Sequence, residues 1–445
     1  MKPNLVYVFA DQWRAQATGC TGDPNAKTPH VDALAGESLN FTHAVSGCPV
    51  CSPYRGSLLT GQYWLTHGVF LNDVCLGNEA TSFAEALNED GYDTAYIGKW
   101  HLDGHGRSSF IPRERRQGFQ LWRVLECTHD YNDSLYYGDD PTPLRWEGYD
   151  AIAQTREAER YLREHKGEKP FALFLSWGPP HDPYLTAPQE YRDLFDPEKL
   201  VLRPNVPKEM EAEARKMLAG YYAHCAALDA CVGDLLKTLG DLGQADNTLF
   251  IFTSDHGDML YSHGEKNKQR PYDESIRVPF LLRFPSRLGG TGKELKTLLN
   301  TPDILPTVLG LLGINPPDTA EGIDFSSELL AGREPVVDAA LYACPAPFGQ
   351  WTRNQGGREC RGIRTLRHTY IRDLNGPWLL FDNETDPYQM DNLCGKEEVQ
   401  ELQARLDQLL ATKLAERDDR FLPAADYIAK WNYTVDENGT VPYSR

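Results

Sequence analysis

The sequence predicts an α/β protein with a doubly wound, mostly parallel sheet and a smaller C-terminal antiparallel α+β subdomain. Three observations lead to this fold class. Short apolar runs alternate with helical patterns along most of the chain, polar residues follow these runs, and near the C-terminus a hairpin pattern precedes a single helix. Alternating strands and helices are typical of a parallel sheet, whereas consecutive strands followed by one helix indicate an antiparallel sheet.

The strands and helices of the main domain are predicted from periodicity. The apolar runs predicted as strands are residues 5–10, 94–97, 171–176, 248–253 and 278–282. The clearest helix carries apolar residues at steps of three and four from Leu218 to Leu239, and Gly240 and Gly243 are expected to end it. Residues 303–314 are predicted as the last helix of this domain.

The C-terminal part of the chain follows a different pattern. Residues 360–373 and 378–382 are predicted as the strands of a hairpin with a turn at 375–377, and residues 399–410 as an amphipathic helix. We therefore predict two units, an α/β domain at residues 1–335 and a subdomain at residues 336–445 with a small antiparallel sheet and a packing helix.

Composition narrows the class of protein. Of 445 residues, 41% are hydrophobic and 24% charged, as in ordinary globular proteins. The net charge of −19 argues against nucleic acid as a partner, because phosphate backbones attract basic surfaces. No apolar run approaches a membrane span, so no membrane contact is expected. The ten cysteines, spread along the chain, indicate reduced thiols rather than a disulfide framework.

The N-terminus shows no convincing leader, because the first apolar run is short and passes directly into Asp11 and Gln12. The protein is therefore expected to be cytoplasmic as encoded, or periplasmic or secreted if a signal was removed. The oligomeric state stays open.

Polar side chains gather after the predicted strands. They are Asp11, Gln12, Lys99, His101, His181, Asp255 and His256. In open α/β sheets, ligands bind in the crevice at the carboxyl ends of the strands. The sequence therefore predicts a functional site at this edge.

A second cluster of informative residues lies at 51–61, which reads Cys-Ser-Pro-Tyr-Arg-Gly-Ser-Leu-Leu-Thr-Gly. It resembles the formylglycine-conversion motif of type I sulfatases. Other windows resemble motifs of that family in the same order, at residues 98–101, 179–182, 254–257, 268–279 and 380–387. The chain is thus similar to sulfatases of the alkaline-phosphatase superfamily along nearly its whole length. The resemblance implies an alkaline-phosphatase-like fold and sulfuric ester hydrolysis.

The resemblance also implies the cofactors. Cys51 would be oxidised to formylglycine by a formylglycine-generating enzyme or an anaerobic maturase, and one hydroxyl of its hydrate would attack sulfur. A divalent cation would be held by Asp11, Gln12, Asp255, His256 and an oxygen of the modified Cys51. The oxygen donors suit Ca2+, while the imidazole leaves Mn2+ or another divalent ion open.

The roles of the remaining residues follow from the same resemblance. Lys99 and Lys268 would bind the sulfate oxygens, and Arg55 would orient the hydrate. His181 would protonate the departing alcohol, and His101 would deprotonate the remaining hydroxyl so that sulfate leaves. The expected substrate is a small sulfated molecule, preferably a mono- or oligosaccharide.

Two alternatives stay open at this point. Gln12 and His256 also occur together in phosphonate monoester and phosphodiester hydrolases, which could use the same site. A non-catalytic glycan-binding relative is the second alternative, supported only by Tyr54, which stands where the family usually has a small residue. The polar and aromatic residues that could line a sugar subsite are Trp64, His67, Asp73, His105, Arg107, Arg113, Trp122, His129 and Arg361.

Overall fold

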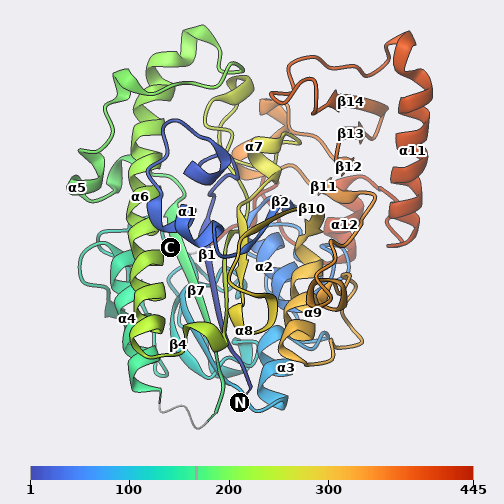
Figure 1. Cartoon of the computed structure of the whole chain (residues 1–445). Coiled ribbons are helices and arrows are strands. Elements are labelled where there is room, and N and C mark those ends of the chain that lie inside the picture. Colours follow the sequence, from blue (N-terminus) through green and yellow to red (C-terminus); the bar gives the residue numbers. More distant parts are fainter. Residues whose placement is uncertain (1, 166–168, 444–445) are drawn as a thin grey trace.

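An eight-stranded sheet forms the centre of the protein in the computed structural model, which describes residues 2–165 and 169–443. The strand order is β10-β2-β9-β8-β1-β7-β3-β4 (Figure 1). All neighbours pair in parallel except β9, which runs antiparallel to both β2 and β8. The strands are β1 (Asn4–Asp11), β2 (Leu39–Val45), β3 (Asp93–Lys99), β4 (Leu121–Leu125), β7 (Phe171–Pro180), β8 (Thr248–Ser254), β9 (Phe280–Arg283) and β10 (Lys293–Asn300).

Helices cover both faces of this sheet, as the alternation along β1 requires. Successive side chains of a strand point to opposite faces. Leu5, Tyr7 and Phe9 belong to one hydrophobic cluster, and Val6 and Val8 to the other. The first cluster includes residues of α2 (Cys51–Thr60), α3 (Phe83–Glu89) and α9 (Thr301–Leu312). The second includes residues of α1 (Pro29–Ala35), α4 (Asp150–Glu164) and α6 (Glu211–Asp241). The doubly wound, mostly parallel sheet is confirmed.

The remaining elements of the main domain are short. They are β5 (Leu135–Tyr136), β6 (Leu144–Arg145), α5 (Gln189–Arg192), α7 (Asp273–Ile276), α8 (Pro285–Leu288) and α10 (Ser326–Leu330).

Two local predictions need correction. Gly240 does not end the long helix, because α6 continues to Asp241, and the left-handed conformation comes later at Gly243, where φ is 67°. The run at 278–282 becomes a strand only from Phe280, and it is antiparallel to its neighbours. Direction and partner depend on long-range pairing, which the periodicity of one run does not contain.

The C-terminal sheet has four antiparallel strands in the order β11-β12-β13-β14. They are β11 (Ala340–Cys344), β12 (Cys360–Arg364), β13 (His368–Asp373) and β14 (Gly376–Asp382), and they are followed by α11 (Gln400–Ala415) and α12 (Ala424–Lys430). The predicted hairpin strand at 360–373 is therefore two strands, and the turn predicted at 375–377 overlaps the start of β14. The small antiparallel sheet and its packing helix are confirmed.

The two sheets share a hydrophobic core. Leu341 of β11, Ile363 of β12 and Leu410 of α11 belong to the same cluster as β1 and α2. Because the C-terminal sheet packs directly on the main domain, we propose residue 335 as the boundary between an α/β domain and a subdomain that depends on it.

The described residues contain no helix with both the length and the apolar character that a membrane span needs. All ten cysteines are free thiols, as the sequence predicts.

Candidate active site

Strand register brings the predicted site residues to one edge of the sheet. β1 and β8 are parallel, with Ala10 opposite Ser254, so Asp11 and Asp255 emerge side by side. β1 and β7 are also parallel, with Asp11 opposite Pro180, which places His181 next to them. Carboxyl ends of neighbouring parallel strands form the ligand crevice of such sheets. The convergence that the sequence predicts is therefore a consequence of parallel pairing.

Gly98 allows β3 to deliver Lys99 to this edge. A Cβ atom at position 98 would lie 2.0 Å from the backbone oxygen of Ser176 in β7, and φ at Gly98 is 106°. Both the contact and the conformation exclude other residues. The glycine that precedes Lys99 is thus explained by the close approach of two strands.

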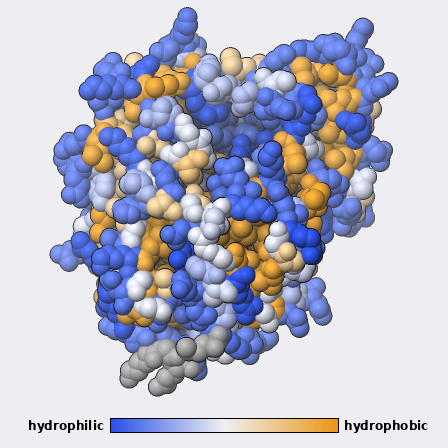
Figure 2. Space-filling view, in the orientation of Figure 1, coloured by the Kyte–Doolittle hydropathy of each residue, from blue (hydrophilic) through white to orange (hydrophobic). Residues whose placement is uncertain are grey.

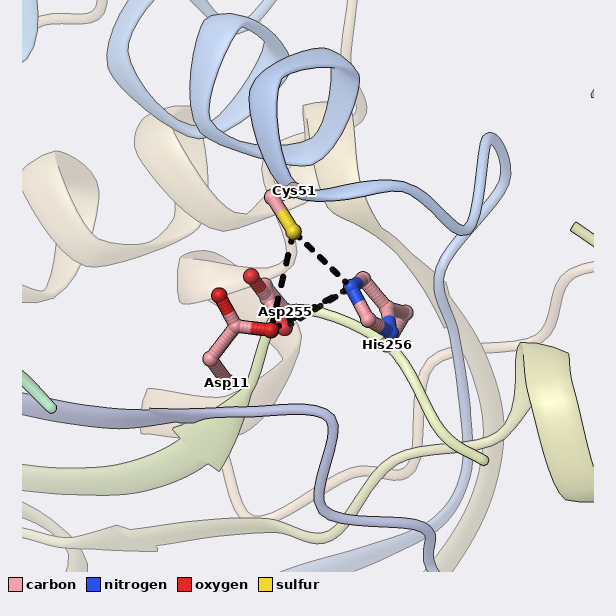
Figure 3. A group of neighbouring side chains, drawn as sticks. All are labelled: Asp11, Cys51, Asp255 and His256. Atoms are coloured by element: carbon pink, nitrogen blue, oxygen red, sulfur yellow. Dashed lines mark hydrogen bonds and ion pairs between the residues drawn. The ribbon is translucent and has the colours of Figure 1, made fainter. Parts of the chain in front are cut away.

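Four buried side chains form what we call the Cys51 cluster: Asp11, Cys51, Asp255 and His256 (Figure 3). Their ligand atoms all lie within 4.8 Å of one another. The Cys51 sulfur lies 3.4 Å from His256 Nε2 and 3.6 Å from Asp11 Oδ1. Cys51 is the first residue of α2, and the positive end of a helix dipole favours negative charge there.

The orientation of His256 prepares it to bind a cation. Its Nδ1 donates a hydrogen bond of 3.0 Å to the carbonyl oxygen of Gly257, so Nε2 carries the lone pair and faces Asp11 and Asp255, 3.5 Å from an oxygen of each. Burial and the charge of Lys268 lower the pKa of His256, which keeps the ring neutral. Two carboxylates and one neutral imidazole fit a divalent cation.

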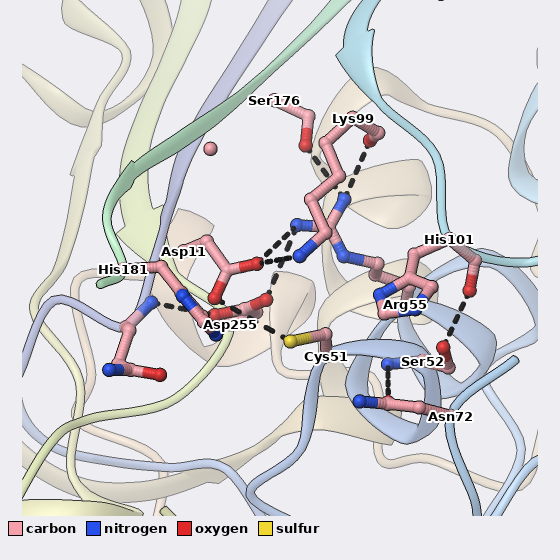
Figure 4. Close-up of polar contacts among 12 residues, drawn as sticks. Asp11, Cys51, Ser52, Arg55, Asn72, Lys99, His101, Ser176, His181 and Asp255 are labelled. Carbon is pink, nitrogen blue, oxygen red and sulfur yellow. Dashed lines mark hydrogen bonds and ion pairs between the residues drawn. The ribbon is translucent and has the colours of Figure 1, made fainter. Parts of the chain in front are cut away.

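Arg55 holds the two carboxylates of the Cys51 cluster (Figure 4). Its Nη2 lies 3.3 Å from Asp255 Oδ2 and 3.5 Å from Asp11 Oδ2, and its Nη1 donates to the backbone oxygen of Lys99 and to Ser176 Oγ, each at 2.7 Å. Lys99 Nζ donates to Asp11 Oδ2 at 2.5 Å. Burial raises the pKa of Asp11, but Lys99 and its other cationic neighbours outweigh it and hold the pKa well below its ordinary value.

Lys268 joins Gln12 to the Cys51 sulfur. Its Nζ donates to Gln12 Oε1 at 3.0 Å and lies 3.2 Å from the sulfur. Gln12 Nε2 in turn donates to Asp258 Oδ2 at 2.7 Å. The amide oxygen of Gln12 therefore faces the cluster, but here it is engaged by Lys268.

His101 lies beside α2 and is held by Asp73. Its Nε2 donates to Asp73 Oδ1 at 3.3 Å, while Arg107 donates two bonds of 2.8 Å to the same carboxylate. Ser52 Oγ donates to the backbone oxygen of His101 at 2.6 Å, which fixes it against the start of α2. The buried Nδ1 of His101 has no hydrogen-bond partner among the described residues.

His181 is buried on the other side of the cluster, and Figure 4 shows its ring beside Asp11. Its Nδ1 donates to the backbone oxygen of Asp182 at 2.8 Å, and its ring stacks on His129 with centroids 4.6 Å apart. Burial and the charge of Lys268 lower the pKa of His181 well below its ordinary value.

The structure brings the ten predicted site residues into one neighbourhood and adds partners that spacing did not reveal. Ser176 lies within a predicted strand, and Asp258 follows His256 by two positions, a spacing that could have drawn attention to it. Asp73 and Arg107, considered only for a sugar subsite, form the pair that holds His101. Other subsite candidates are buried in the packing of the protein: Trp64, His67, Trp122 and Arg361.

Comparison with known proteins identifies the family. A family model described as Sulfatase matches residues 3–314, and one described as N-sulphoglucosamine sulphohydrolase, C-terminal, matches residues 262–416. An ulvan-active sulfatase of Formosa agariphila is 48% identical over 99% of this chain and 87% of that protein. The chain belongs to the sulfatase family, and the prediction that it is a sulfuric ester hydrolase is confirmed.

Solved structures agree with this assignment. One from a study of glycosaminoglycan metabolism by Bacteroides thetaiotaomicron has a TM-score of 0.87 and 30% identity, covering 97% of this chain and 99% of that one. The phosphonate monoester hydrolase of Agrobacterium radiobacter has a TM-score of 0.75 and 24% identity, covering 100% of this chain and 99% of that one. The second likeness concerns the fold alone.

Proposed function

We propose that this sulfatase removes sulfate from a sulfated carbohydrate, using a formylglycine made from Cys51 and a divalent cation, with Ca2+ as the preferred ion. The observation that carries the proposal is the position of the Cys51 sulfur. It is buried at the first residue of α2, 3.2 Å from Lys268 Nζ and 3.4 Å from His256 Nε2. An oxygen nucleophile at this position would lie among cations and metal ligands.

Asp11, Asp255 and His256 would hold the cation together with an oxygen of the modified residue, and Gln12 Oε1 would join them by releasing Lys268. When bound, the cation and the modified residue supply an activated hydroxyl nucleophile. Most of these ligands are oxygen atoms, which favours Ca2+, and the imidazole of His256 is also compatible with Mn2+. Arg55 would keep both carboxylates in place and charged, since it contacts each of them.

Lys99 and Lys268 would bind the sulfate oxygens. A sulfate ester repels nucleophiles through its own negative charge, so the site must neutralise it. Both lysines are buried, at 6% and 3% exposure, and Coulomb attraction is stronger there than in water. Their present partners, Asp11 and Gln12, are the groups that a cation would engage.

His181 would protonate the departing alcohol oxygen. Its pKa is lowered because it is buried and because Lys268 lies nearby. An anionic ester between the lysines would offset their charge and raise this pKa, so the ring would gain its proton as substrate binds. His181 would therefore be protonated when the substrate is bound, ready to donate its proton to the leaving oxygen.

His101 would accept the proton that releases sulfate at the end of the reaction. The Nε2–H group of His101 donates to Asp73, so Nδ1 carries the lone pair and is free to accept a proton. Burial lowers the pKa of His101, but Cys127 and Asp73 more than compensate and the net pKa is raised. A raised pKa makes the ring a stronger proton acceptor.

A sulfated carbohydrate is proposed because relatives are named for ulvan and for glycosaminoglycan metabolism. Conversion of Cys51 requires a formylglycine-generating enzyme or an anaerobic maturase as a partner.

The test concerns Cys51. Coexpressed with a maturase, the peptide that carries Cys51 should show the mass of the aldehyde and react with a hydrazide probe. Cys51→Ala should abolish turnover while the melting temperature and the circular dichroism spectrum stay close to wild type. Full turnover by a preparation whose Cys51 is wholly unmodified thiol would overturn the proposal.

A phosphonate monoester or phosphodiester hydrolase is the second candidate, because His256 belongs to the Cys51 cluster and the amide oxygen of Gln12 faces it. The values of kcat/KM for aryl sulfate and aryl phosphonate esters with the same leaving group separate the two. We expect sulfate to be preferred, and a large preference for phosphonate would reverse the assignment.

A further inference from the structure

A cavity of about 440 Å3 lies outside the Cys51 cluster. Its lining includes Arg14, Gln16, Asp23, Arg203, Arg277 and Tyr388, and it contains none of the ten proposed active-site residues. Figure 2 shows a hydrophilic hollow in the upper part of the face in view, where Figure 1, in the same orientation, labels α7. Arg277, which lines the cavity, directly follows α7.

Arg14 is the unusual residue of this cavity. Its side chain is only 2% exposed, and its buried Nε and Nη1 have no hydrogen-bond partner in the described part of the chain. A guanidinium is always charged and carries five donors, so leaving two of its nitrogens buried without partners is costly, even though the side chain also contacts Tyr222. Its backbone is anchored, because Arg14 N donates to the Tyr221 hydroxyl at 2.9 Å, and that hydroxyl donates to Gln12 O at 2.8 Å. Arg14 thus lines the cavity from an anchored backbone.

Neighbouring carboxylates do not accept hydrogen bonds from Nε or Nη1 of Arg14. Asp23 interacts with it through space, but the carboxylate of Asp23 accepts from the Tyr222 hydroxyl and from Asn25 N. Glu274 is bonded to Arg203 Nε at 3.0 Å. Arg277 pairs with Asp273 and keeps a buried Nε without a partner among residues 2–165 and 169–443. Asp23, Glu274 and Asp273 thus have other partners, while Nε and Nη1 of Arg14 and Nε of Arg277 remain without one in the described residues.

We propose that this cavity is a second oxyanion site, which binds a sulfate or carboxylate group against Arg14, beside the ion-paired Arg203 and Arg277. Several observations carry the inference: the cavity, the unpartnered donors of Arg14 and Arg277, and the concentration of arginine in a chain whose net charge is −19. Arginine forks match the geometry of planar and tetrahedral oxyanions. The site does not depend on conversion of Cys51 or on a metal.

The direct test is a crystal of the wild-type protein soaked in sodium selenate, whose anomalous signal marks the anion. We expect a peak within hydrogen-bond distance of Arg14 in addition to any peak at Lys99 and Lys268. Titration calorimetry with sodium sulfate should show the corresponding binding in solution. Crystals without a peak at Arg14, at a selenate concentration that fills the lysine site, would refute the inference.

Size-preserving variants and a matched control separate a loss of anion binding from a loss of folding. Gln16→Glu preserves side-chain size but adds a negative charge to the lining, and it should weaken this binding about tenfold or more. Arg14→Met should abolish it. Gln244→Glu is the matched control, since its Oε1 is also buried without a partner in the described chain but lies outside the cavity. Equal sulfate affinity in Gln16→Glu and Gln244→Glu would contradict the proposal.

Two sources of the anion can be distinguished by competition. If glucuronate or glucose 6-sulfate displaces selenate from Arg14, the site takes a charged group of a glycan. If only inorganic sulfate displaces it, the site takes the free ion. Either result supports an oxyanion site, whereas displacement by neutral glucose at the same concentration would argue against recognition of charge.

Discussion

Replacing Arg55 tests whether it holds the carboxylates of the Cys51 cluster in place. Its side chain is 1% exposed, and Nη2 lies 3.3 Å from Asp255 Oδ2 and 3.5 Å from Asp11 Oδ2. Arg55→Met would leave Asp255 without its ion pair to arginine, while the Lys99 carbonyl would keep only its hydrogen bond from the Tyr96 hydroxyl. Breaking a buried pair by removing one partner costs about 3–5 kcal/mol, so we expect a loss of that size in the free energy of unfolding without calcium.

Calcium should reduce this loss. A divalent ion neutralises the same two carboxylates, and Arg55 would no longer repel it. An ion present at a hundred times its Kd stabilises a protein by about 2.7 kcal/mol, and the variant should gain more than wild type does. The assay is urea unfolding followed by tryptophan fluorescence, with chelator and with calcium.

Arg361→Met is the matched control. Arg361 is also fully buried and lies 2.5 Å from Asp419, in the C-terminal subdomain away from the cluster. It should lose a similar free energy, about 3–5 kcal/mol, but calcium should not narrow its difference from wild type. Equal calcium responses of the two variants would refute the assignment of Asp11 and Asp255 as ligands.

Three further substitutions test the roles of individual side chains. Asp255→Asn should weaken calcium binding by more than about tenfold, measured by calorimetry, because the ion loses a charged ligand; undiminished activity in chelator would contradict this. His181→Ala should slow hydrolysis of sugar sulfates by about 100-fold or more and activated aryl sulfates far less, because an alkoxide needs a proton and a stable phenolate does not. Equal losses would assign His181 to sulfate binding. Asp73→Asn should lower kcat by up to about 100-fold with little change in KM, because His101 loses the partner that fixes its tautomer, and a change confined to KM would argue for a binding role.

Much of the fold and of the candidate site could be predicted from local patterns. The apolar runs of β1, β3, β7 and β8 and the three-to-four spacing in α6 each lie within one segment, so the sequence alone was sufficient to find them. The residues that follow the strands were predictable as a site, because parallel strands carry their carboxyl ends to the same edge. The window at 51–61 identified Cys51 without any tertiary information.

Only the tertiary structure decided how distant segments meet. β9 runs antiparallel because it pairs with β2 and β8, and nothing within 278–282 encodes that direction. Asp73 meets His101 across 28 positions, and Arg14 lines a cavity with Arg203. Such contacts depend on the free energy of packing whole elements together, which no local spacing contains. Periodicity thus determined the fold class and the motif resemblance determined the family, while packing determined which charge has a partner and which has none.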